Sequence, residues 1–267
     1  MPTRLRLGLF PLAVLGFALA ACSDNPTGPS TGSPDLSTLL AEVSSPLINS
    51  ATRAILPAGV GEMTIPAVDP GRCPYSAATG FFACPEVVVN GITITRMFRL
   101  IDAAGNSQSK PDAQTSAIEL VNTVKGTMSP PAGFGSSGAI TLNDSSDMTL
   151  SGIRIEQHTL NGFSKGTMVG TFESNGVSIP LNTLITQTTN NVVLPNAKAG
   201  QKWPQSGSIA IDETSDIDAV GSSAVTTHVV MTFNGTSIVT VTFTNTFGTT
   251  TCRFDMANPD VSGTTCS

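Results

Sequence analysis

The chain has 267 residues, 40% of them hydrophobic and only 12% charged, and its formal net charge at pH 7 is −6. This acidic balance, without any cluster of Lys and Arg, excludes nucleic acid as an expected partner, because a phosphate backbone is bound by a basic surface. Thr, Ser, Gly and Asn supply most of the polarity, which is typical of β-proteins whose solvent faces carry hydroxyl groups.

The first residues show the three parts of an export signal. Arg4 and Arg6 precede an apolar run, Leu7 to Leu19, which is too short to span a bilayer as a helix, since spanning takes about 20 apolar residues. The run ends in the sequence Leu19-Ala20-Ala21-Cys22. This sequence resembles the lipobox of bacterial lipoprotein precursors.

The resemblance implies that residues 1–21 are a signal peptide and that Cys22 carries the lipid at the start of the mature protein. Two or three acyl chains on this residue anchor stably, because each buried methylene adds about 0.8 kcal/mol. In this family an Asp directly after the Cys signals retention in the inner membrane. Here Ser23 takes that place, so the resemblance implies the outer membrane.

A tether and a helix are expected next. Residues 22–33 combine the lipidated Cys with a flexible segment rich in Pro, Gly, Ser and Thr. An amphipathic helix is predicted within residues 34–56, with Ser33 as its N-cap and a kink at Pro46. Its stripe lies either on a sheet or on the membrane surface. The stripe consists of Leu36, Leu39, Leu40, Val43, Leu47 and Ile48.

Residues 34–267 are predicted to form a single, mainly β domain. We expect an antiparallel meander, as a curved sheet, a sandwich or a barrel, with the helix packed on it. The clearest hairpin has Asn90-Gly91 as its turn, which pairs Val89 with Ile92 and Val87 with Ile94. A second hairpin turns at Asn234-Gly235.

In the second hairpin, a strict two-residue turn would put the apolar sets of its two strands on opposite faces. We therefore predict a β-bulge near Ile238, which would restore one apolar face. The threonine row that follows, at positions 240, 242, 244 and 246, is predicted to be the solvated face of its strand.

Two segments of the chain are similar. Gly138–Met148 parallels Gly207–Ile217, and Gly152 and Gly221 follow at the same spacing. This similarity suggests a repeated strand, acidic turn, strand and hairpin unit of about 70 residues, in line with a long meander. Chance likeness between two Thr/Ser-rich hairpins is the alternative.

Four cysteines remain after the lipobox: Cys73, Cys84, Cys252 and Cys266. An even number in an oxidising compartment predicts disulfides, and three pairings are possible. We expect the two local ones, Cys73–Cys84 and Cys252–Cys266, each adding roughly 3 kcal/mol by constraining the unfolded chain. No C-x-x-C occurs, so metal binding by these residues is not expected.

The best metal candidate is an acidic segment that contains Asp212, Glu213, Asp216 and Asp218. Carboxylates on a turn supply the oxygen ligands that Ca²⁺ takes. The matching segment offers only Asn143, Asp144 and Asp147. The alternative is a solvated turn held by side-chain-to-backbone hydrogen bonds, and we expect no resident metal and no cofactor.

No catalytic residue is expected. The chain has two histidines, His158 and His228, and no Gly-x-Ser-x-Gly motif. A hydrolase would need one histidine to meet both a carboxylate and a nucleophile. Among the aromatic residues, Trp203 is predicted to be a packing anchor, and Phe81-Phe82 is interpreted as core filling or as an exposed contact.

These features favour a non-catalytic, lipid-anchored envelope protein that binds an apolar ligand or a protein partner. Lipoproteins with a sheet and a helix that carry lipids across the envelope are similar in broad outline. A structural or adhesive surface lipoprotein is the first alternative, and a hydrolase is the second.

Overall fold

The computed structural model describes residues 72–129, 137–155, 157–174, 177–195, 199–216, 224–257 and 265–267. The expected signal peptide 1–21, tether 22–33 and helix 34–56 lie outside these residues. Across the described ranges every regular element is a strand. None of these residues belongs to a helix of the length and apolarity that crossing a membrane requires.

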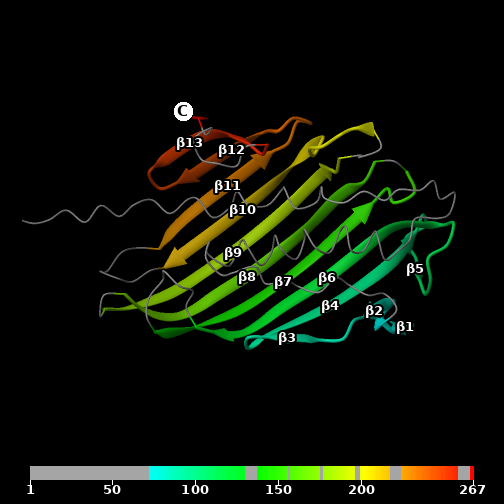
Figure 1. The fold of residues 1–267 in the computed structure, drawn as a ribbon, viewed down its shortest axis with the longest axis horizontal. Helices are drawn as coiled ribbons and strands as arrows, with labels where there is room; N and C mark the ends of the chain where they lie inside the picture. Colours follow the sequence, from blue (N-terminus) through cyan, green and yellow to red (C-terminus); the bar gives the residue numbers. More distant parts are fainter. Residues whose placement is uncertain are drawn as a thin grey trace, which may run out of the picture.

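The strands form one antiparallel sheet of 14 strands (Figure 1). Neighbours in the sheet follow one another along the chain from β6 to β14, so the predicted antiparallel meander is confirmed. The strands are β1 (Tyr75–Ser76), β2 (Phe81–Ala83), β3 (Val87–Val89), β4 (Ile92–Asp102), β5 (Ser107–Gln108), β6 (Thr115–Met128), β7 (Gly138–Ser151), β8 (Thr159–Ser174), β9 (Val177–Val193), β10 (Ser206–Asp216), β11 (Val225–Thr232), β12 (Ile238–Asn245), β13 (Gly248–Asp255) and β14 (Thr265–Cys266).

The sheet is open. The path of paired strands begins at β1 and ends at β14, and these two ends do not pair with each other. β3 and β5 pair with β4 beside that path. Of the three architectures that the sequence allowed, the described residues therefore form the curved sheet, and they form neither a closed barrel nor a second sheet of a sandwich.

The two faces of the sheet differ in burial. On β7 the even-numbered residues from Ile140 to Leu150 are buried, whereas the odd-numbered residues from Thr141 to Ser151 are exposed or half-buried. This alternation follows from the pleat of a strand, in which successive side chains point to opposite faces. We call the side with Ile140 the buried face and the side with Thr141 the outer face.

The hairpin at Asn90-Gly91 forms with the predicted register. Val89 pairs with Ile92, and Val87 pairs with Ile94. The φ angles are 51° at Asn90 and 81° at Gly91, which is the left-handed backbone that a type I′ turn requires at both positions. Ile92 and Ile94 are buried, so local turn chemistry places these apolar side chains on the buried face.

The bulge predicted near Ile238 is wrong. β11 pairs with β12 in one continuous register in which Met231 faces Val241. Residues 233–237, a loop longer than two residues, separate the strands. Within it Asn234 Oδ1 accepts hydrogen bonds from Thr236 N and Oγ1, at 3.1 and 2.7 Å. The longer loop restores the single apolar face that the bulge was expected to provide.

The acidic turns expected in the two similar segments are strands. The first segment lies in β7, and the second begins in β10. In β7, Ile140, Leu142, Met148 and Leu150 share the buried face. The alternation of buried and exposed residues continues through the polar stretch between Leu142 and Met148, as expected for an extended chain. The expected repeat therefore marks two strands of one sheet rather than two hairpin units with turns at these positions.

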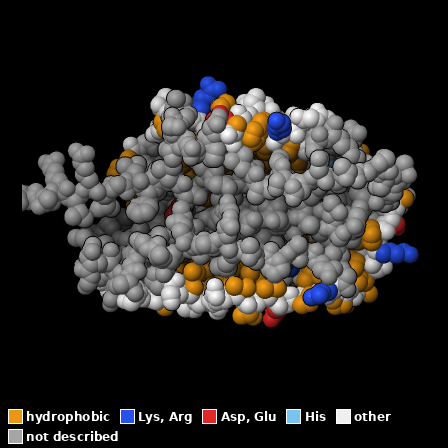
Figure 2. Space-filling view, in the orientation of Figure 1, with side chains coloured by type: hydrophobic (Ala, Val, Ile, Leu, Met, Phe, Trp, Pro, Cys, Tyr) orange, Lys and Arg blue, Asp and Glu red, His pale blue; other side chains and the backbone are white. Residues whose placement is uncertain are grey.

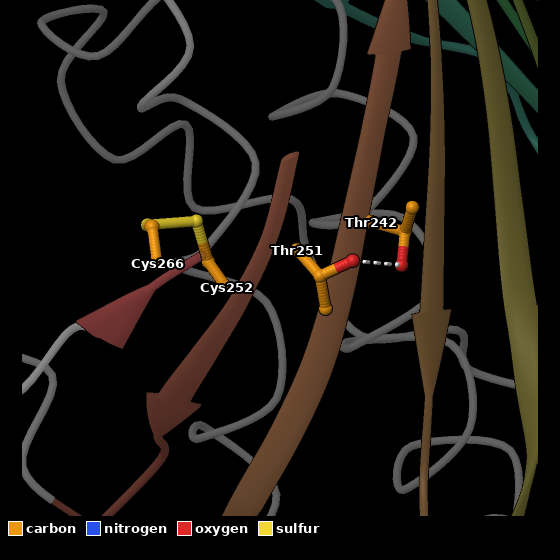
Figure 3. Close-up of a disulfide and its surroundings, with 4 residues drawn as sticks. All are labelled: Thr242, Thr251, Cys252 and Cys266. Carbon is orange, nitrogen blue, oxygen red and sulfur yellow. Dashed lines mark hydrogen bonds between the residues drawn. A yellow bond between two sulfur atoms is a disulfide. The ribbon is translucent and has the colours of Figure 1, made fainter. Parts of the chain in front are cut away.

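The two local disulfides form, as predicted. Cys73 is bonded to Cys84, and Cys252 is bonded to Cys266. Figure 3 shows the second disulfide, which joins β13 to the short terminal strand β14. Beside it, Thr251 and Thr242 share a hydrogen bond of 3.3 Å between β13 and β12. Each disulfide thus lies at one end of the open sheet.

Candidate functional site

A row of polar side chains crosses the middle of the buried face. Its members are direct cross-strand neighbours on five adjacent strands, β4, β6, β7, β8 and β9, and all are buried. Strands lie about 4.8 Å apart, so the row extends across roughly 19 Å. This polar row consists of Arg96, Asn122, Ser146, Ser164 and Gln187.

A bulge in β9 brings Gln187 into the row. The register between β8 and β9 shifts between Leu160 and Gly162. Asn191 takes the extra place with a φ of 48°, and its N–H donates to Asn161 Oδ1 at 2.7 Å. Because of this shift Val192 and Gln187 both lie on the buried face.

Hydrogen bonds within the row leave one acceptor unused. Asn122 Nδ2 donates to Ser146 Oγ at 3.3 Å, and Gln187 Nε2 donates to Thr189 Oγ1 at 3.5 Å. Asn122 Oδ1 is buried and accepts no hydrogen bond. A buried polar atom without a partner costs about 1–3 kcal/mol, so this atom makes the row a candidate for contact with a ligand.

Charged groups lie in and beside the polar row. Burial lowers the pKa of Arg96 to about 10, which still leaves the guanidinium charged at neutral pH. Asp144 lies two residues before Ser146 on the same face of β7. Burial raises its pKa to about 7. Burial also raises the pKa of Glu213, which is on β10. All three shifts have the same cause, the removal of water from a charged group.

The two rows beside the polar row carry apolar side chains, and one of them also holds the carboxyls of Asp144 and Glu213. On the side of β4's C-terminal end, Phe98, Leu120 and Met148 are buried cross-strand neighbours. On the other side, Ile94 and Val124 face each other next to Asp144. The buried face therefore has a polar centre, with an apolar row on one side and a row of apolar and acidic residues on the other.

The histidine His228 lies on the outer face, where its Nδ1 is 2.6 Å from Asp212 Oδ1. The two residues are direct neighbours on β11 and β10, and their side chains are 44% and 58% exposed. The Asp212 carboxylate thus orients His228, which is one arrangement that a hydrolase requires. The pair, however, lies on an exposed face of the sheet. His158 lies just before β8, and its carbonyl accepts a hydrogen bond from Leu194 N.

The calcium candidates do not converge. Asp212 and Asp216 are exposed on the outer face of β10, whereas Glu213 points to the opposite face of the same strand. Asp218 lies outside the described residues. No cluster of three or more His, Cys, Asp or Glu suited to a metal occurs among the residues that the structure describes.

The two neighbouring phenylalanines separate. Phe82 stacks on Phe98 with ring centroids 4.6 Å apart and belongs to the core. Phe81 points away from it and lies under the Arg99 guanidinium, 5.0 Å from the ring centroid. Of the two interpretations, core filling applies to Phe82 and not to Phe81. Trp203 packs against the core, as predicted.

Among the coloured side chains in Figure 2, few are charged. Hydrophobic side chains gather there along the border at which β3 and β4 lie in Figure 1. Val88 on β3 is 67% exposed. This border is an edge of the sheet, and it includes β4, the strand that carries Arg96.

The polar row was missed by the sequence analysis. A signal was present, since Arg96 interrupts an apolar alternation that runs from Ile92 to Leu100 with a period of two. The same is true of Asp144 and Ser146 between Leu142 and Met148. A charged or polar residue in phase with buried neighbours indicates a polar position on a buried face.

The fold and the site define a class: an open antiparallel β-sheet protein whose buried face carries a polar centre. No family model, no curated protein and no solved structure matches the chain.

Proposed function

We propose that this protein is exported and anchored to the outer membrane through lipid on Cys22. The lipobox sequence Leu19-Ala20-Ala21-Cys22 supports this proposal. Cells that express the protein should incorporate radiolabelled palmitate into it, and a Cys22→Ser variant should lose the label. Equal labelling of both proteins would overturn the anchor.

The mature domain, in this proposal, is a non-catalytic binding or carrier protein for an apolar ligand. The observation that carries it is the buried face. The described strands form a single layer, yet apolar side chains on one face, such as Ile92, Phe98 and Val241, are fully buried. Such a surface favours apolar contact by about 25 cal/mol per Å² removed from water.

The segment 34–56 is proposed as a helix that packs on the same face. Its apolar stripe supports this arrangement, because a helix with one apolar face needs a second layer to cover that face. Leu40→Asp and Val43→Asp should therefore lower the melting temperature, whereas Ser37→Asp, off the stripe, should leave it unchanged. Equal effects at all three positions would contradict the packing.

Native mass spectrometry with organic extraction tests the ligand. The sample is the mature chain with Cys22→Ser, which removes the lipid and keeps every other residue. We expect an apolar molecule to co-purify in stoichiometric amount. A clean mass of the protein alone, together with no binding of the apolar dye N-phenyl-1-naphthylamine, would overturn the carrier function and direct attention to protein partners.

A further inference from the structure

We propose that the ligand of the buried face is an amphiphile whose polar head bears hydroxyl-type hydrogen-bond donors and lies on the polar row. The apolar chain of this amphiphile lies along the flanking row of Phe98, Leu120 and Met148. This inference rests on the proposed binding of an apolar ligand and adds the chemistry of the head group.

The first step is the unused acceptor at Asn122. The side chain is only 5% exposed, and its Oδ1 accepts no hydrogen bond, although its Nδ2 is engaged with Ser146 Oγ. Leaving a buried acceptor unpaired is costly. A ligand that brings an O–H or N–H to this atom recovers that cost on binding, whereas a purely apolar ligand does not.

The second step is the kind of atom that surrounds Asn122 Oδ1. The Ser146 hydroxyl is its cross-strand neighbour, and the Ser164 hydroxyl follows on β8. Asp144, which is 3% exposed, lies two residues before Ser146 on β7 and on the same face. Each of these groups offers an oxygen that accepts hydrogen bonds, whereas Arg96, the neighbour of Asn122 on β4, is a donor. A hydroxyl group both donates and accepts, so a head group with several hydroxyls complements this set.

The third step is the apolar surface on either side. Phe98, Leu120 and Met148 form one flanking row, and Ile94 and Val124 belong to the other. Residues two apart on a strand are separated by roughly 7 Å. A hydrocarbon chain that leaves the polar row toward Phe98, Leu120 and Met148 therefore meets apolar side chains at once, whereas the opposite row also holds the Asp144 carboxyl.

Displacement of N-phenyl-1-naphthylamine from the mature Cys22→Ser chain tests the inference with two matched competitors. 1-Monoolein has two free hydroxyl donors on its head, and methyl oleate has the same chain with none. We expect monoolein to displace the dye at a concentration at least tenfold lower. Equal displacement by both would overturn the head-group inference and leave the apolar site standing.

Failure of the proposed function gives a different result. In that case the dye does not bind and neither competitor changes the melting temperature, which overturns the site and the head-group inference together. These two outcomes are distinguishable because the dye reports the apolar surface and the ratio of the competitors reports the head group.

Variants locate the head group. Asn122→Leu should abolish the preference for monoolein and change the melting temperature little, because it removes the unpaired Oδ1 together with the hydrogen bond from Nδ2 to Ser146 Oγ. Asn143→Leu, on the outer face of the neighbouring strand, should keep the tenfold preference. Ser146→Ala and Ser164→Ala provide the same readout if Asn122→Leu fails to fold. An unchanged preference in all three row variants would overturn the inference.

Discussion

Asp144 and Glu213 lie in one cross-strand row of the buried face, at equivalent positions of the two similar segments. Asp144 pairs with Gly166, Gly166 with Ile185, and Ile185 with Glu213. Burial raises the pKa of both carboxyls. The two similar segments thus place two acids, each with a pKa raised by burial, on one side of the polar row.

We expect the stability of the protein to fall as the pH rises from about 4 to about 7. Asp144 has a pKa of about 7 in the folded protein against a usual 3.8, so the folded state binds the additional proton in this window. Its contribution is present below pH 4 and is lost as the pH rises through 7. Asp144→Asn removes the charge, and at pH 8 it should stabilise the fold by on the order of 3 kcal/mol.

Urea unfolding at pH 5 and pH 8 measures this effect. The matched control is Asp216→Asn, which changes an exposed carboxyl on the outer face of β10. It should leave the difference between the two pH values as it is in the unaltered protein. A pH dependence that is the same in the Asp144→Asn variant would contradict the assignment of the effect to this residue.

The hairpin at residues 87–94 could be predicted from sequence because its register is local. Asn90-Gly91 specifies the turn, and the turn specifies the pairs. The polar row could not be predicted in this way. Its five residues meet only through the registers of four strand pairs, one of which contains the bulge at Asn191. A shift of one residue in any pair would move a member to the outer face.

The middle of β7 shows a second limit of the sequence analysis. The run Asn143 to Asp147 has the composition of a turn, and it was predicted to be one. Pairing with β6 and β8 on both sides keeps it extended. Pairing with neighbouring strands therefore outweighs the local preference of this run for a turn. As a consequence the carboxyl of Asp144 is buried.

Removing the disulfide at β14 should destabilise the protein and expose its sheet edge. β14 has two residues, and its pairing with β13 includes Cys252 and Cys266 themselves. The double variant Cys252→Ala/Cys266→Ala should lose about 3 kcal/mol, as expected for a short closed loop. It should also aggregate faster, because an uncovered edge strand pairs with other chains. Urea unfolding and light scattering measure the two effects.

The disulfide Cys73–Cys84, at the other end of the sheet, provides the control for the aggregation measurement. In Cys73→Ala/Cys84→Ala, β4 remains covered by β3 and β5. This variant should lose similar stability but aggregate more slowly than the variant at β14. Equal aggregation rates would show that edge exposure is not the cause.

A methyl group at Gly170 should destabilise the sheet. A Cβ at this position would overlap the carbonyl oxygen of Ala139 on β7 and lie 2.8 Å from Ile140 Cα. Because backbone atoms of a paired strand cannot turn aside, Gly170→Ala should cost about 1–3 kcal/mol. Thr171→Ala, at the next and exposed position, should change stability by less than about 0.5 kcal/mol. Chemical unfolding of both variants decides the point.

Calcium should have no effect on the melting temperature. Asp212 and Asp216 point to the outer face of β10, and Glu213 points to the buried face, so the three carboxyls cannot share one ion. Melting curves with excess chelator and with millimolar Ca²⁺ should coincide. A rise in melting temperature with Ca²⁺, abolished by Asp212→Asn, would contradict this reading and restore the candidate site.

The pair of His228 and Asp212 should contribute little to stability in spite of its 2.6 Å separation. Both side chains are well exposed, and exposed ion pairs are worth at most about 1 kcal/mol because water screens them. A double-mutant cycle with His228→Ala and Asp212→Asn should give a coupling energy below that value at neutral pH. A coupling above about 2 kcal/mol would mean that the pair is shielded from water, for instance by a bound partner on this face.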